Sequence, residues 1–233
     1  MNSQYYLPDD VHVCACGTIY IILDAVNDRY LCLTSDQSYL FAQLAAADGH
    51  VPTFSKAGQL ANRLADQGIL TPRHAAGHPI AHRTFPAAAY SITDRHPVSR
   101  PLPHWKHTPH LMLAIAICLA LRKAGRRHIA RCVHAARTWK AGIPGNSDTS
   151  RDQVLALTES FHALTPYFFT TQDACFFRSL VLLRFLSSFN ISAEWVFGVR
   201  LAPFDAHCWV SHRGILLNET CDKAAEYQPI MVV

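Results

Sequence analysis

Residues 173–219 decide the fold of this chain; in order they read DACFFRSLVLLRFL (173–186), AEWVFGVRLAPFDAHCWV (193–210) and SHRGILLNE (211–219). Cys175 opens an apolar run with helical spacing. His207 follows 32 residues later in a segment typical of a strand, and Glu219 comes 12 residues after it. A thiol, an imidazole and an acid in this order are typical of thiol protease and acyl-transfer sites.

The thiol of Cys175 needs a neighbour that activates it, because only the thiolate is a good nucleophile. Three residues just upstream can cap a helix: Thr170, Thr171 and Asp173. Cys175 then falls in the first helical turn, where free N–H groups and the helix dipole favour an anion. We expect His207 to act as the base and as the acid that protonates the leaving amine.

The sequence offers two neighbouring residues, Asn218 and Glu219, as the group that orients His207. If Arg213-Gly214 forms a two-residue hairpin turn, His207 pairs with Thr220 and has Asn218 as its diagonal neighbour on the same face. If the loop is one residue longer or bulged, His207 lies opposite Glu219. The side chains of Asn218 and Glu219 point to opposite faces. Two further acids are alternatives: Asp205 and Asp222.

Four pieces of this region carry a resemblance: CFFRSLVLLRFL, FGVR, PFDAHCWV and LLNE. Together they resemble the Cys-His-Asp leader peptidase of lasso peptide biosynthesis, the B protein, in the transglutaminase-like papain superfamily. The resemblance covers residues 170–233 and implies Cys175 as nucleophile and His207 as base. The family pattern ends in Asn-Asp where this chain has Asn218-Glu219, so the resemblance implies a Cys-His-Glu triad.

The N-terminal region is predicted to hold three short strands within residues 11–33, separated by turns at Gly17 and Asn27-Asp28. Ser35 and Asp36 are expected to cap a helix that runs to about residue 47, and Ser55 to begin a second that ends at Gly68. This order resembles a winged-helix-like, PqqD-like RiPP recognition element, which holds the leader of a ribosomal precursor peptide.

The resemblance implies that the leader adds as a strand to an exposed sheet edge. We expect the third strand to be this edge and the helix of residues 55–67 to line the groove. The expected leader-binding residues are Arg29, Tyr30, Leu31, Cys32 and Leu33. The alternatives are a structural cap on the catalytic domain and a nucleic-acid-binding module.

Residues 72–109 contain 7 of the 13 prolines and 6 of the 14 histidines. Because proline removes backbone donors and fixes φ, this stretch is predicted to be an extended linker. The predicted organisation is a leader-binding domain (1–71), a Pro/His-rich linker (72–109) and a transglutaminase-like cysteine protease domain (110–233). The predicted fold class is α+β.

The predicted catalytic domain begins with an apolar run, residues 111–121, that is too short to span a bilayer and is predicted to be a buried helix. Residues 122–140 are basic without an acid, which indicates a solvated helix face or a docking surface. An amphipathic helix over residues 154–164 is expected to pack against the helix of Cys175. Gln172 is a candidate amide donor for an oxyanion hole.

Metals and nucleic acids are not expected as ligands. His12, Cys14 and Cys16 form a CxC cluster without the second pair of ligands that a zinc finger needs. The net charge of +4 gives no indication of a nucleic-acid partner. The first residues, MNSQYYLPDD, lack a signal-peptide pattern, so we expect a cytoplasmic protein with reduced thiols and no transmembrane segment.

The predicted function is a cysteine peptidase that removes the leader from a lasso-type precursor peptide. The resemblance implies that an ATP-dependent, asparagine synthetase-like lasso cyclase is the partner and that the peptidase itself needs no cofactor. Two alternatives stay open: an acyl transferase of the same superfamily, and a non-catalytic scaffold that binds the precursor.

Overall fold

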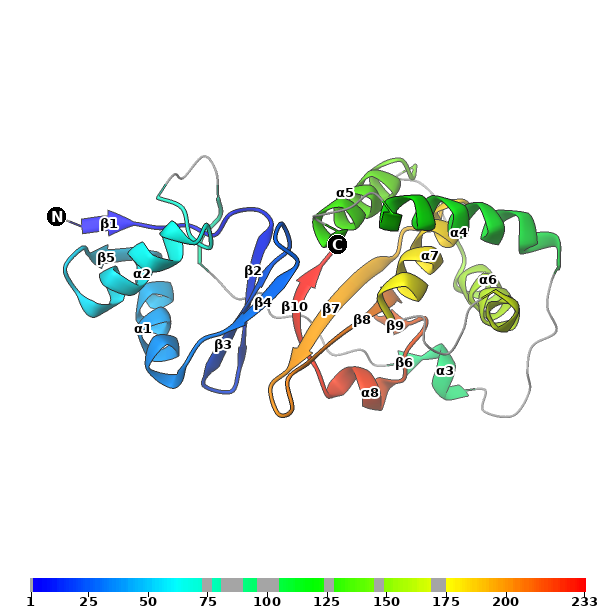
Figure 1. The fold of residues 1–233 in the computed structure, drawn as a ribbon. Helices are drawn as coiled ribbons and strands as arrows, with labels where there is room; N and C mark the ends of the chain where they lie inside the picture. The colour runs from blue at the N-terminus through cyan, green and yellow to red at the C-terminus, as the bar shows by residue number, and fades with distance from the viewer. Residues whose placement is uncertain are drawn as a thin grey trace. The chain divides into compact units, whose positions relative to one another are not determined.

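The computed structural model describes residues 2–72, 77–80, 90–95, 105–123, 128–144, 149–168 and 175–233. The chain divides into two compact units, residues 1–84 and 85–233 (Figure 1).

The N-terminal unit contains the three predicted strands as an antiparallel sheet in the order β2-β3-β4. Their bounds are β2 (Val11–Cys16), β3 (Ile19–Asp24) and β4 (Arg29–Cys32). A second, two-stranded sheet joins β1 (Asn2–Gln4) to β5 (His50–Pro52). Within its sheet β4 pairs only with β3, so it is an edge strand, as predicted.

The helix α1 (Ser35–Ala46) packs on β3, and α2 (Lys56–Asp66) packs on α1 and β5; buried side chains such as Phe41 and Leu60 join them in one core. The cap of α1 differs from the prediction. Thr34 is the N-cap, and it shares a capping box with Gln37, so the predicted capping residues Ser35 and Asp36 lie inside the helix. The predicted cap of α2 is confirmed, because Ser55 accepts a hydrogen bond from the N–H of Gly58.

The described parts of the predicted linker, residues 72–109, are built into the two units. His78 exchanges backbone hydrogen bonds with Leu7, and Ile80 is buried in the N-terminal core. β6 (Tyr90–Ser91) is an edge strand of the C-terminal sheet. Extended chain between prolines still carries N–H and C=O groups, so it can form such short bridges.

The C-terminal unit is built on a five-stranded sheet in the order β10-β7-β8-β9-β6. The strands not yet given are β7 (Glu194–Arg200), β8 (Asp205–His212), β9 (Ile215–Leu216) and β10 (Gln228–Val232). All neighbouring strands are antiparallel except β6 and β9, which are parallel.

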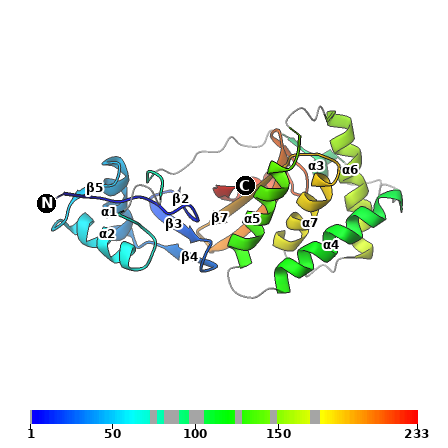
Figure 2. The ribbon, with the colours of Figure 1, turned by 90° about the horizontal axis from the view of Figure 1, so that it is seen from above.

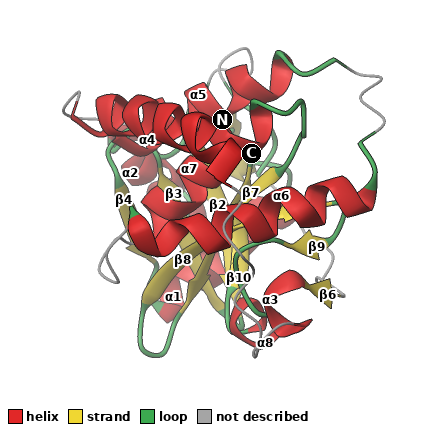
Figure 3. Cartoon of the chain, turned by 90° about the vertical axis from the view of Figure 1, so that its right-hand side faces the viewer, coloured by secondary structure: helices red, strands yellow, loops and turns green. Residues whose placement is uncertain are grey.

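The helix α7 (Cys175–Ser187) is the centre of this unit. It contacts β7 and β8, and it is surrounded by α4 (Thr108–Lys123), α5 (His128–Ala141) and α6 (Arg151–Leu164) (Figures 2 and 3). The predicted contact between α6 and α7 is confirmed. Short elements complete the unit: α3 (Ile92–Arg95), η2 (Trp105–His107), η3 (Thr165–Tyr167) and α8 (Cys221–Ala225).

The apolar run in α4 is not fully buried, contrary to the prediction. Leu111, Ala114 and Cys118 are buried, whereas Met112 and Leu113 are each about half exposed, at 51% and 54%. One helical face packs on α5 and α7, and an apolar residue on the opposite face stays at the surface because a helix presents side chains all round. None of the helices in the described ranges is long and apolar enough to cross a membrane.

Candidate active site

Cys175 is the first residue of α7. Apolar side chains such as Leu182 and Phe185 are fully buried and hold this helix between the sheet and the other helices. The first N–H groups of an α-helix lack intrahelical partners, so the start of α7 favours a thiolate. The candidate caps at 170, 171 and 173 and the candidate oxyanion donor Gln172 lie outside the described residues.

His207 lies on β8 and pairs with Gly198 of β7. A Cβ atom at Gly198 would come within 2.8 Å of the Trp209 ring and of the Tyr227 Cβ atom. Because Gly198 has no side chain, these two rings fill the space, and the ring centroid of His207 lies 5.2 Å from that of Tyr227 and 6.1 Å from that of Trp209. The imidazole is therefore packed against two aromatic rings.

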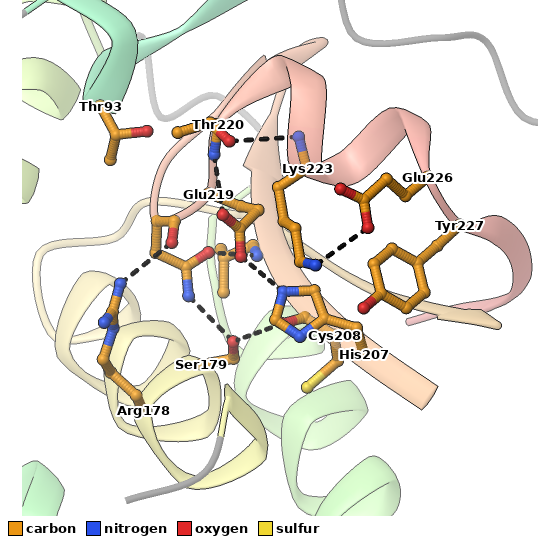
Figure 4. Close-up of polar contacts among 12 residues, drawn as sticks. Thr93, Arg178, Ser179, His207, Cys208, Glu219, Thr220, Lys223, Glu226 and Tyr227 are labelled. Atoms are coloured by element: carbon orange, nitrogen blue, oxygen red, sulfur yellow. Dashed lines mark hydrogen bonds and ion pairs between the residues drawn. The ribbon is translucent and has the colours of Figure 1, made fainter. Parts of the chain in front are cut away.

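Glu219 contacts His207 directly, with 2.5 Å between Nε2 of the imidazole and Oε2 of the carboxylate (Figure 4). The second carboxylate oxygen accepts a hydrogen bond of 3.0 Å from the N–H of Thr220. The side chains of His207 and Glu219 are only 17% and 19% exposed. Both carboxylate oxygens of Glu219 therefore accept hydrogen bonds. Because Nε2 of His207 binds Glu219, Nδ1 is the imidazole nitrogen left to interact with Cys175.

The hairpin register follows the first of the two predicted alternatives. Arg213 and Gly214 both have positive φ, at 50° and 79°, as a two-residue type I′ turn requires. Ser211 pairs with Leu216, the register that would bring Thr220 opposite His207 if the strand continued. However, β9 ends at Leu216 and the chain bends over residues 217–219, which brings Glu219 to the imidazole.

Asn218, the other predicted orienter, serves a different purpose. Its Oδ1 accepts a hydrogen bond of 2.7 Å from the N–H of Val210, so the side chain replaces the backbone carbonyl that a neighbouring strand would offer to β8. Its Nδ2 donates to Oγ of Ser179 at 2.9 Å, and Ser179 in turn donates to the carbonyl of Cys208 at 3.3 Å (Figure 4). Asn218 therefore ties the bend to both α7 and β8.

The electrostatic surroundings favour a charged Cys175. A hydrogen bond from the Cys208 thiol, together with those from His207 and the backbone of Cys208, lowers the pKa of Cys175 to about 4 although burial opposes the charge. Burial raises the pKa of Cys208 well above its ordinary value. Cys208 consequently keeps its hydrogen and acts as the donor to the neighbouring thiolate.

The imidazole of His207 is held in its charged form. Burial disfavours this charge, but the hydrogen bonds and charges of Cys175 and Glu219 outweigh burial and raise the pKa of His207 to about 9. Burial likewise opposes the charge on Glu219, but the hydrogen bonds from His207 and Thr220 lower its pKa. The arrangement at neutral pH is a thiolate–imidazolium pair beside a carboxylate, which can attack a carbonyl carbon and deliver a proton.

A family model, described as the transglutaminase-like superfamily, matches residues 111–232, just over half of the chain. The chain belongs to the transglutaminase-like superfamily. The matched region runs from within α4 to β10, so it contains four of the five strands of the sheet, all but β6, and all three residues of the candidate site. Neither the comparison with curated proteins nor that with solved structures found a match.

Domains of the transglutaminase-like superfamily have a fold of the cysteine protease or acyltransferase type, and their catalysis usually resembles that of cysteine proteases. The C-terminal unit of this mixed α/β chain carries that domain, which agrees with the part of the sequence prediction that named the superfamily.

The remaining candidates of the transglutaminase-like unit lie elsewhere. Asp205 accepts a hydrogen bond of 2.7 Å from the Tyr227 hydroxyl and forms an ion pair of 3.3 Å with Arg200. Asp222 lies in the first turn of α8. Within the described ranges, no three His, Cys, Asp or Glu side chains gather as metal ligands would.

The expected leader-binding residues belong to the N-terminal unit. Arg29 to Cys32 form β4, and Leu33 follows the strand and is buried in the core. The Arg29 guanidinium binds the carboxylate of Asp24 at 2.9 Å and the carbonyl of Gln67, at the end of α2, at 3.1 Å. One end of β4 is therefore fixed to the end of α2.

Sequence reasoning missed four residues around the site: Cys208, Arg178, His162 and Ser91. Arg178 stands three residues after Cys175, and this helical spacing could have placed both on one face. Cys208 follows His207 on a strand, where alternation gives neighbouring side chains opposite faces, so the sequence did not point to it. Ser91 and His162 are distant in sequence and carry no local signal.

Proposed function

We propose that this chain is a cysteine peptidase that removes the leader from a lasso-type ribosomal precursor peptide. The observation that supports it most is the contact between His207 and Glu219, which leaves Nδ1 for a Cys175 thiolate at the start of α7. The segments of this chain that resemble the lasso leader peptidases, quoted in the sequence analysis, support a lasso-type precursor peptide as the substrate.

In the proposed reaction the Cys175 thiolate attacks the carbonyl carbon of the last leader residue and forms a tetrahedral oxyanion. As the C–N bond breaks, Nδ1 of His207 donates its proton to the departing core amine. A water molecule gives one proton to the now neutral His207 as it attacks the thioester; the C–S bond then breaks, which releases the leader acid, ionised to the carboxylate in water, and restores the Cys175 thiolate beside the imidazolium. Glu219 stays ionised and keeps the imidazole oriented.

The proposed reaction takes its nucleophile from Cys175 and its proton from His207, so it requires neither metal nor nucleotide. We propose that ATP is used by the partner, an asparagine synthetase-like lasso cyclase, which joins the freed amine to an acidic side chain. The eight cysteines all lie within the described residues and none forms a disulfide, which agrees with the reducing, cytoplasmic location that we propose.

The N-terminal unit is proposed to bind the leader as a PqqD-like recognition element, with residues 1–71 as the binding domain. The support is that β4 is an edge strand whose start is fixed to the end of α2. An added strand would receive backbone hydrogen bonds from β4 and side-chain contacts from the groove. Holding the leader there raises the effective concentration of the scissile bond at the catalytic unit.

An acyl transferase is the second candidate, because the same thioester accepts an amine as well as water. The superfamily match supports this reaction and peptide hydrolysis equally. Product mass separates the two: a hydrolysed leader gains water, whereas a transferred leader carries the accepting amine.

The test is mass spectrometry of the precursor peptide after incubation with this protein and the cyclase, beside Cys175→Ala, Glu219→Gln and the control Cys221→Ala. Cys221 is another partly exposed thiol, outside the proposed triad. We expect cleavage to be lost with Cys175→Ala, weakened with Glu219→Gln and kept in the control. Cleavage by Cys175→Ala would contradict the peptidase and favour a precursor-binding scaffold.

A further inference from the structure

The bend that carries the acid, residues 217–219, is held by side chains from three other elements. We refer to these residues as the acid-bearing bend. Each of its three successive carbonyl oxygens accepts a hydrogen bond: Leu217 from Nε2 of His162 (2.7 Å), Asn218 from a guanidinium nitrogen of Arg178 (3.0 Å) and Glu219 from Oγ of Ser91 (2.5 Å). The donors come from α6, α7 and β6.

The direction of each hydrogen bond is fixed by chemistry. A carbonyl only accepts, so Nε2 of His162 carries the hydrogen. Burial lowers the pKa of His162 to about 4, which makes this side chain a neutral donor at neutral pH. The Ser91 hydroxyl has one hydrogen, which goes to Glu219, while its oxygen accepts from the N–H of Thr93 at 3.0 Å.

The acid-bearing bend needs these donors because it lies beyond the end of β9. No sheet ladder satisfies its carbonyl groups, and buried carbonyl groups require partners. Arg178 lies three residues after Cys175 on α7, so its hydrogen bond links the helix of the nucleophile to the bend of the acid (Figure 4). The position of Glu219 relative to His207 thus depends on groups that touch neither imidazole nor thiol.

We propose that Ser91, His162 and Arg178 are positioning residues that hold the acid-bearing bend. They keep the Glu219 carboxylate against Nε2 of His207 and so preserve the thiolate–imidazolium pair. This inference rests on the proposed function, since it assigns a purpose to the bend within that reaction.

His162 gives the sharpest test because it is neutral and its loss removes a hydrogen bond without removing a charge. His162→Phe fills the space but has no donor, whereas His162→Gln keeps an N–H that can reach the Leu217 carbonyl. Arg178 is less suited, because losing its positive charge alone would raise the pKa of His207, whereas displacing Glu219 would lower it. The control is Arg184→Met, on α7 but bonded to Ser187 rather than to the bend.

The experiment measures alkylation of Cys175 by iodoacetate as a function of pH, without any peptide substrate. Tryptic peptide 152–178 contains Cys175 as its one cysteine, so mass spectrometry reports this thiol alone. Iodoacetate is an anion, so its reaction falls off when the neighbouring imidazolium loses its proton. The groups that face the imidazole are Cys175 of α7, Asp205 of β8, Glu219 of the bend and Tyr227 before β10, and Cys208 of β8 interacts with the Cys175 thiol.

We expect wild type and Arg184→Met to show a bell-shaped profile whose alkaline limb lies near pH 9. In His162→Phe this limb should move to lower pH by about one unit, and His162→Gln should restore most of the shift. A folded His162→Phe with an unchanged limb would overturn the positioning inference while leaving the proposed function intact. A wild-type thiol that reacts only above about pH 8, as an ordinary cysteine does, would instead contradict the proposed function.

Discussion

Nε2 of His207 lies 2.5 Å from Oε2 of Glu219, and this contact decides which nitrogen of the ring is left for the thiol. An imidazole that receives a carboxylate at Nε2 keeps its proton-donating Nδ1 for the reaction. The longer side chain of glutamate reaches the ring from a bend rather than from a paired strand position. The charge and the geometry of the candidate site therefore depend on the same short contact.

The pKa of His207 should fall when the thiolate is removed. Burial disfavours the imidazolium, and Cys175 and Glu219 together raise the pKa to about 9. In Cys175→Ala the contribution of the thiolate is lost and that of Glu219 remains, so we expect His207 to deprotonate at lower pH than in the wild type. Titration of the imidazole by NMR measures this directly, and an identical midpoint in the two proteins would contradict the ion pair.

Shortening the acid should impair the reaction as much as neutralising it. In Glu219→Asp the carboxylate withdraws by one methylene and loses the contact with His207, and a misplacement of about 1 Å costs roughly a hundredfold in rate. Glu219→Gln keeps the length but loses the charge that supports the imidazolium. We expect kcat/KM to fall in both, measured across pH 5 to 9, and a fully active aspartate variant would show that the bend can readjust.

Replacing Asn218 by Leu should destabilise the fold rather than act on the chemistry alone. The N–H of Val210 and the hydroxyl of Ser179 would lose buried partners, at about 1 to 3 kcal/mol for each unsatisfied group. Urea unfolding measures the change. Ser179→Ala keeps the hydrogen bond between the Val210 N–H and Asn218, and besides the bond to Asn218 it loses only the longer one, of 3.3 Å, to the Cys208 carbonyl. It should therefore cost less, and equal losses in the two variants would contradict this account.

Gly198→Ala should be destabilising because its Cβ atom would meet the Trp209 ring and Tyr227 at 2.8 Å. Overpacking of this kind costs about 1 to 3 kcal/mol. Gly142→Ala is the matched control, because its Cβ would meet backbone oxygens only at ordinary distances, the nearest at 3.5 Å. Thermal unfolding should separate the two, and a neutral Gly198→Ala would mean that the aromatic rings are free to move.

Leader binding at β4 predicts a specific effect of proline. Leu33 donates its N–H to Tyr20 of β3, so by alternation the N–H of Cys32 points away from β3 towards the proposed leader strand. Cys32→Pro removes that donor, whereas Cys32→Ala keeps it. We expect Cys32→Pro, but not Cys32→Ala, to weaken binding of a fluorescent leader peptide severalfold, because one lost hydrogen bond costs about 1 kcal/mol of binding free energy. Equal affinities of the two variants would argue against strand addition at this edge.

Local patterns accounted for most of the secondary structure. The strands around Gly17 and Asn27-Asp28, the cap at Ser55 and the turn at Arg213-Gly214 follow from residue preferences that act within a few positions. The helix after Cys175 follows from apolar spacing in the same way. Each of these signals is contained in the segment that it describes.

The cap of α1 was misplaced by one residue within a local motif, whereas two other failures of prediction involve partners outside the segment. β6 forms inside a proline-rich stretch because β9 lies beside it, and Met112 and Leu113 of α4 stay exposed because the buried face of this helix meets α5 and α7. β9 and α7 lie far along the chain from these segments, so a local window of sequence does not contain them.

The sequence by itself determined the chemical types at the candidate site, a cysteine at a helix start, a histidine on a strand and an acid after the hairpin, because spacing and periodicity are local properties. Only the tertiary structure decided between Asn218 and Glu219. Pairing residues across the hairpin assumes that the second strand continues beyond Leu216. The chain instead bends there, and hydrogen-bond donors from three distant elements hold the bend. Long-range hydrogen bonds of this kind have no counterpart in the order of residues.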